Sequence, residues 1–124
     1  MTAWRMALVA SAMYLLLGSA YVLRTPLWQA PDEPAHFNYV EHIAEGAGLP
    51  VLQTGDYDQA RLEDLTADRF RDGAVETLRY EAHQPPLYYL LMTPVSAATR
   101  GQLTALRFAS LQWTWPMRPF GIAA

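Results

Sequence analysis

The 124-residue chain has room for one small domain or for part of a larger protein, and its charges are separated by region. It contains no Lys and no Cys, which excludes disulfides, thiolate chemistry and a Cys-ligated zinc site. All twelve acids lie between Asp32 and Glu81, where only four arginines oppose them, so this segment carries twelve minus four, or eight, net negative charges. Such a segment argues against nucleic acid as a partner, because nucleic acids bind basic surfaces.

The first apolar segment, Met6 to Leu23, has 18 residues without a charge and is flanked by Arg5 and Arg24. This length is just sufficient for a helix to cross the hydrocarbon core of a bilayer. A basic flank without acids favours a cytoplasmic N-terminus, which leaves the acidic segment outside.

A secretory signal peptide is the alternative interpretation of this segment. The small residues "GSA" at 18–20 are typical of a cleavage site. However, the apolar run continues to Leu23, and Trp4 and Trp28 flank it as interfacial anchors do, which favours an uncleaved helix.

A second apolar run, "PPLYYLLMTPVSAAT", extends from Pro85 to Thr99. Two prolines suit the first turn of a helix, and Pro94 is expected to kink it. The run is short for a membrane span. A third apolar segment, Leu103 to Leu111, surrounds Arg107 and passes into "QWTWPMRPFGIAA" without further apolar length, so we expect a truncated chain or a final dozen residues from another reading frame.

Between the two apolar runs, helical spacing predicts an amphipathic helix over Ala35 to Glu45 that begins near Asp32 or Glu33. We expect it to pack Phe37 and Val40 against the spans or the membrane surface. A weaker helix is predicted within residues 57–71.

The predicted fold is therefore an α-helical membrane protein with two transmembrane helices, residues 1–24 and 85–100. An external loop with short amphipathic helices, residues 25–84, joins them. Residues 101–124 form a short turn and a truncated, atypical third segment.

Several polar residues have both a structural and a functional interpretation. Asp32 suits a helix N-cap, and it also suits a partly desolvated general base. His36 lies four residues later, so both side chains are placed to share a ligand or metal, although such pairs are common on surface helices. His83 fits a hydrogen-bonded interfacial residue or a metal or phosphate contact. Tyr88 and Tyr89 are expected in the interfacial aromatic belt.

The order of these motifs along the chain indicates a protein family more specifically than any single motif does. An apolar helix followed by "LWQAPDEPAHFNYVEHIAEGAGLP", then "YEAHQPPLYYLL", then a basic Gly turn and "ALRFASL", resembles the start of polytopic GT-C class glycosyltransferases. These include protein O-mannosyltransferases and the transferase that adds aminoarabinose to lipid A. The resemblance covers nearly all of residues 5–111, and its most specific part is the pairing of "PDE" with "PPLYY".

The resemblance implies sugar transfer from a polyprenyl-phosphate donor to an acceptor hydroxyl at the external face of the plasma membrane. Asp32 corresponds to the base of the family, and Glu33 to the neighbouring acid that binds the acceptor or organises the loop. His36 is expected to contact substrate. His83 and Gln84 stand near the donor phosphate, where relatives often have Lys or His. A divalent metal is one candidate cofactor.

Two spans and a partial third do not enclose a polyprenyl phosphate, so we expect this chain to be inactive by itself. The sequence also allows two other interpretations. The first is a non-catalytic membrane protein whose acidic external loop binds a partner, and the second is a secreted acidic polypeptide released by signal cleavage. Membrane lipid is an expected partner of the glycosyltransferase fragment and of the non-catalytic membrane protein.

Overall fold

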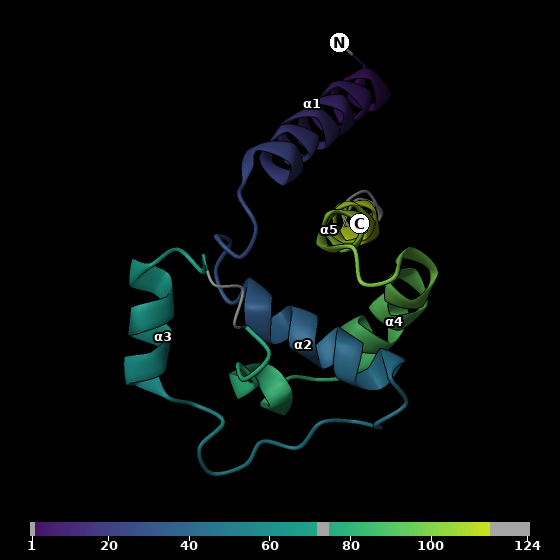
Figure 1. The fold of residues 1–124 in the computed structure, drawn as a ribbon. Helices are drawn as coiled ribbons and strands as arrows, with labels where there is room; N and C mark the ends of the chain where they lie inside the picture. The colour runs from purple at the N-terminus through teal and green to yellow at the C-terminus, as the bar shows by residue number, and fades with distance from the viewer. Residues whose placement is uncertain (1, 72–74, 115–124) are drawn as a thin grey trace.

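The computed structural model describes residues 2–71 and 75–114, and within these ranges the chain is helical without any strand (Figure 1). This confirms the α-helical fold class. The elements, in chain order, are α1 (Ala3–Arg24), α2 (Glu33–Ala44), α3 (Gln59–Ala67), the 3₁₀ helix η1 (Tyr80–His83), α4 (Leu87–Thr99) and α5 (Leu103–Thr114).

Helix α1 contains the whole predicted apolar segment and is 22 residues long, which is about 33 Å at 1.5 Å per residue. Among the described residues it is the one helix whose length and hydropathy allow it to cross a membrane, a test that a signal sequence also passes. Only Val22 of this helix is buried. Its N-terminal half projects beyond the other helices and exposes large apolar side chains to the surroundings (Figure 1).

The second apolar run forms α4, which continues through Pro94 to Thr99. With 13 residues it is about 20 Å long, against the roughly 20 residues that a membrane span needs. The two-span arrangement therefore stays a prediction. The third apolar segment forms α5, while residues 115–124 of the atypical C-terminal segment lie outside the described residues.

The main core lies where α2 crosses α4 and α5. Its buried side chains are Tyr39, Val40, Tyr89, Met92 and Leu106, with Phe37 packed at its edge. The rings of Tyr39 and Tyr89 stack with their centroids 3.6 Å apart. The structure confirms the prediction that a helix begins near Asp32 or Glu33 and ends near Glu45. Phe37 and Val40 pack toward α4 and α5, and their predicted contact with spans or a membrane surface stays a prediction.

One prediction about α4 is wrong. Tyr89 is only 3% exposed and lies in the core, so it is no member of an interfacial belt. The apolar pattern of α4 has no polar face that would reveal which of two adjacent tyrosines points inward. Tyr88 is exposed, and its hydroxyl is 2.6 Å from the hydroxyl of Ser110 on α5.

The turn between α4 and α5 depends on Gly101. Its φ is +70°, a left-handed conformation that suits glycine, and its N–H donates to the carbonyl of Ser96 at 3.0 Å. A Cβ at this position would lie 3.1 Å from Oε2 of Glu41. Glu41 also accepts a hydrogen bond from the buried hydroxyl of Ser96, so α2 is tied to the end of α4.

Helix α3 packs on the other side of α2 and lies within the range predicted for the weaker helix. The buried side chains of this second cluster are Ala35, Leu65 and Leu78. The amide of Asn38 donates to the carbonyls of Val75 and Leu78, at 2.5 Å and 2.8 Å, and so holds the segment before η1 against α2.

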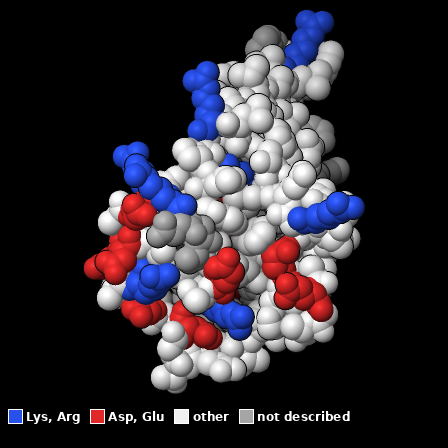
Figure 2. Space-filling view, viewed as in Figure 1, with Lys and Arg blue, Asp and Glu red and all other residues white. Residues whose placement is uncertain are grey.

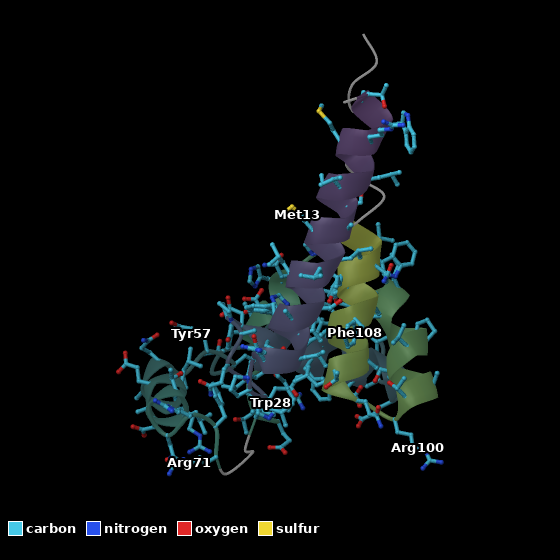
Figure 3. The ribbon with its side chains drawn as sticks, turned by 90° about the horizontal axis from the view of Figure 1, so that it is seen from above. Met13, Trp28, Tyr57, Arg71, Arg100 and Phe108 are labelled. Carbon is cyan, nitrogen blue, oxygen red and sulfur yellow. The ribbon has the colours of Figure 1, made fainter. Side chains whose placement is uncertain are left out.

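Helix α1 packs against α5 through a glycine. Figure 3 shows α1 lying over α5, with Trp28 at the end where the chain turns toward α2. A Cβ at Gly18 would overlap the side chain of Leu111, and the hydroxyl of Tyr14 donates to the carbonyl of Leu111 at 3.3 Å. The absence of a side chain at Gly18 therefore allows close approach of the two helices.

The core position of Met92 can be tested by truncation. Met92 is fully buried, so Met92→Ala should lower the free energy of unfolding by about 2–5 kcal/mol. Met13→Ala is the matched control, because Met13 is 58% exposed on α1. Denaturant unfolding of the detergent-solubilised protein, followed by circular dichroism, measures both. Equal effects of the two substitutions would contradict the core assignment.

Candidate functional site

The first turn of α2 is held in place by an ion pair between Glu33 and Arg107 of α5. Nε of Arg107 lies 2.5 Å from Oε1 of Glu33, and the second guanidinium nitrogen lies 2.7 Å from Oε2. The side chains are only 10% and 11% exposed. Such bidentate geometry is the strong form of an Arg–carboxylate contact.

The remaining donors of Arg107 bind the end of α1 and the turn after it. Its guanidinium donates to the carbonyls of Val22, Thr25 and Pro26 at 3.2, 2.7 and 2.9 Å. A guanidinium has five N–H donors, so these three bonds and the two to Glu33 use all of them. The arginine therefore joins α1, α2 and α5, and it has no donor left for a phosphate.

Trp28 completes this arrangement. Its backbone N–H donates to Oε2 of Glu33 at 2.9 Å, and its ring meets the ring of Phe37 edge-on, with centroids 5.1 Å apart. Its φ of +64° is unusual for a bulky residue and marks the sharp turn between α1 and α2. Trp28 is thus half-buried against α2.

Asp32 immediately precedes α2 but does not cap it with its side chain. Its φ is +55°, whereas a capping Asp needs an extended backbone, and its carboxylate makes no bond to the helix N–H groups. The expectation of a side-chain N-cap is therefore wrong. The exposed carboxylate instead accepts a hydrogen bond from the hydroxyl of Tyr80 at 3.1 Å.

Tyr80 brings η1 to the start of α2. Burial raises the pKa of its phenol above the usual value, and the negative charge of Asp32 raises it further. The phenol therefore stays protonated at all physiological pH values and acts as a lasting donor to Asp32. This contact orients the carboxylate while leaving it exposed.

His36 does not share a ligand with Asp32. Its Nδ1 lies 2.8 Å from the hydroxyl of Tyr89, and its ring lies nearly parallel to that of Tyr89 at 5.9 Å between centroids. The structure thus directs His36 toward α4 and Asp32 toward η1, although the two residues are one turn apart.

His83 and Gln84 lie at the end of η1, the same element that carries Tyr80. Nδ1 of His83 donates to the carbonyl of Tyr80 at 2.9 Å, which leaves Nε2 as the acceptor nitrogen of the exposed ring. The side-chain nitrogen of Gln84 is 3.5 Å from this Nε2. The carbonyl of Gln84 accepts from the hydroxyl of Tyr39 at 3.2 Å, which ties the residue to α2.

A cavity of about 500 Å³ lies between α1, α2 and α5. Its lining includes Glu33 and His36 but neither Asp32 nor His83. Most of its walls are apolar side chains of the three helices: Val22, Phe37, Val40, Leu103, Leu106 and Leu111. The first turn of α2 therefore has a polar, exposed side with Asp32 and Tyr80, and an apolar side that faces the cavity.

Within residues 2–71 and 75–114, no group of three or more His, Asp or Glu side chains is arranged to hold a metal ion. The candidate residues are divided between three partners: Asp32 with Tyr80, Glu33 with Arg107, and His36 with Tyr89.

Two residues of this site were not assigned a role from the sequence. Arg107 lies in an apolar segment, and a buried arginine requires an acidic partner, so this signal was present. Its choice among twelve acids was not encoded locally. Tyr80 carries no signal, since a tyrosine 48 residues from Asp32 gains its role only when η1 packs on α2.

Scans against protein-family models, against curated proteins and against solved structures found no match for this chain.

The ion pair yields a prediction about stability. Arg107→Ala leaves Glu33 buried without its partner and should cost about 3–5 kcal/mol of unfolding free energy. The double variant Arg107→Met with Glu33→Leu removes both charges and should recover a large part of that loss. Denaturant unfolding in detergent measures the three proteins.

Arg61→Ala is the control for the loss of an arginine as such, because Arg61 is exposed on α3. It should change the free energy of unfolding by no more than about 0.5 kcal/mol. A loss from Arg107→Ala no larger than that of Arg61→Ala would contradict the joining role of the ion pair.

Proposed function

We propose that this chain is the first part of a GT-C class membrane glycosyltransferase. The enzyme moves a sugar from a polyprenyl-phosphate donor to an acceptor hydroxyl at the external face of the plasma membrane. Asp32 is the general base in this proposal, and residues 25–84 are extracytoplasmic. The order of motifs along the sequence supports the family, and the geometry at the start of α2 supports the role of Asp32.

The observation that carries the proposal is that the adjacent acids Asp32 and Glu33 have different contacts. Glu33 is bound to Arg107 and to the N–H of Trp28, so its carboxylate is committed to the fold. Asp32 is exposed and held by a neutral phenol, so its carboxylate is free to accept a proton. In this proposal Glu33 therefore organises the loop rather than contacting the acceptor.

The distribution of charge supports the membrane placement. In Figure 2 the visible acidic side chains lie in the lower part of the molecule, among arginines and uncharged residues. The upper part shows no acidic side chain and only a few basic ones. An exposed apolar helix of span length is stable when lipid covers it. Asp32 follows the end of α1 by only eight residues, which puts the acid close to the membrane surface.

The contacts of α1 favour a retained helix over a cleaved signal. Gly18, within the small-residue site, lies against Leu111 of α5, and Arg107 binds the last carbonyls of the helix. Cleavage near residue 20 would remove the first contact, while Val22 and Thr25 would stay with the rest of the chain.

His83 is the candidate for the donor phosphate. Its ring is exposed, its Nε2 is directed away from its own backbone partner, and it lies on the element that also carries Tyr80. Arg107 is unsuited to this task because its donors are occupied.

A second candidate function is a non-catalytic membrane protein whose acidic external region binds a partner. It is favoured by the exposed apolar side chains of Leu49, Val51 and Leu52, which lie in the long connection between α2 and α3. In this case the charge of Asp32 has no chemical task.

Asp32→Asn tests the catalytic role. Asn tolerates the left-handed backbone and still accepts a hydrogen bond from Tyr80, so the variant removes the charge and little else. If Asp32 is the base, sugar transfer from a polyprenyl-phosphate donor should fall by roughly 10²–10⁴-fold at unchanged protein level. Because the chain is expected to be inactive by itself, transfer is measured in membranes that contain a full-length polytopic relative with the same Asp.

Asp58→Asn is the matched control. It changes the same side chain at the N-cap of α3, far along the chain from the site. Full transfer by Asp32→Asn, equal to that of Asp58→Asn, would leave the partner-binding function standing. His83→Ala should give a smaller loss together with weaker donor binding.

Topology is tested by single cysteines and a membrane-impermeant thiol reagent in intact cells. A Cys at Asp58 should be modified and one at Thr2 should not, since positive flanks favour the cytoplasm. A Cys at Arg100 decides the position of α4. The predicted two-span arrangement places Arg100 inside, so we expect this Cys to be protected. Modification would instead put the α4–α5 turn on the same side as α2, whose Glu41 contacts the turn at Gly101. Protection of Asp58 would contradict the proposed function.

A further inference from the structure

The cavity between α1, α2 and α5 has the size and the lining of a binding site for an apolar small molecule. Its volume of about 500 Å³ lies within the range of roughly 300–1,000 Å³ that is usual for small-molecule sites. Walls made mostly of carbon, such as Phe37, Val40 and Leu106, repel water, and apolar cavities of this kind stay dry and take apolar ligands.

The two oppositely charged side chains in the wall are already paired. Arg107 and Glu33 neutralise each other, and the arginine donates its remaining N–H groups to backbone carbonyls. The hydroxyl of Tyr88 is paired with that of Ser110, and Nδ1 of His36 with the hydroxyl of Tyr89. The cavity therefore offers no uncompensated charge to a phosphate or a carboxylate, and its occupant is expected to be an uncharged hydrocarbon.

The place of the cavity on α1 indicates where that hydrocarbon comes from. Gly18, Tyr21 and Val22 line it, and they belong to the last two turns of the helix whose other faces are exposed and apolar. Tyr21 lines the cavity and is itself 56% exposed, so the cavity is continuous with the surface that α1 presents to its surroundings. Since α1 is the candidate span, the molecules next to this surface are lipids.

We infer that the cavity between α1, α2 and α5 binds one hydrocarbon chain of a membrane lipid. The chain enters beside Tyr21 and lies against Phe37 and Leu106, while the polar head remains outside. This inference shares with the proposed function only the membrane placement of α1, and it does not depend on sugar transfer.

Photocrosslinking in nanodiscs tests the inference. The probe is a phosphatidylcholine with a diazirine in the middle of one acyl chain, and labelled peptides are mapped by mass spectrometry. We expect adducts on Phe37 or Leu106 in addition to adducts on Leu16, which is 69% exposed on α1 and reports general contact with lipid.

A cavity-filling variant gives the quantitative readout. Ala30→Phe places a ring in the lining and displaces about two methylene groups of the chain, so labelling inside the cavity should fall about tenfold relative to Leu16. Ala47→Phe is the matched control, because Ala47 is exposed and distant from the lining, and it should leave the ratio unchanged. Ala30→Leu replaces Ala30→Phe if circular dichroism shows that the larger side chain prevents folding.

Two results would overturn the inference. They are labelling of Leu16 without labelling of Phe37 or Leu106, and equal labelling in Ala30→Phe and Ala47→Phe. Each of these leaves the proposed function intact. Absence of labelling at Leu16 as well would show that α1 does not meet lipid, and it would remove the membrane placement on which both proposals rest.

Discussion

The contact on which the rest of the structure depends is the largely buried ion pair of Arg107 and Glu33. Burying two charges carries a large desolvation cost, which is offset only by good geometry and complete hydrogen bonding. Here the guanidinium has five acceptors, and these come from the end of α1, the turn after it and the first residue of α2. The pair thereby joins α1, α2 and α5 in one arrangement.

This constraint decides what lies on each side of the first turn of α2. Because Glu33 points toward α5, the neighbouring Asp32 is directed away from it, toward Tyr80 on η1. Because Arg107 is fully used, the cavity beside it is electrically neutral. An exposed carboxylate and an apolar cavity next to a span-length helix are thus separated by one helical turn.

The two adjacent acids show why a motif does not reveal how its residues are used. In the sequence Asp32 and Glu33 differ by one methylene group and share the same neighbours. In the structure one is a joint between helices and the other is an exposed group with a left-handed backbone. The positive φ at Asp32 is a local departure that the packing of the α1–α2 turn maintains, and such departures are concentrated at functional positions.

The sequence by itself determined the properties that depend on residues close together in the chain. The uncharged run of α1, the helical spacing of Phe37 and Val40, and the prolines before α4 were sufficient to predict the helices and most of their ends. The tertiary structure alone decided which acid pairs with Arg107, which of Tyr88 and Tyr89 enters the core, and whether Asp32 caps its helix. Each of these depends on residues that are distant in the sequence. Glu33 and Arg107, for example, are 74 positions apart. No local pattern specifies such a pair, because the free energy of a buried charge depends on every group that packs around it.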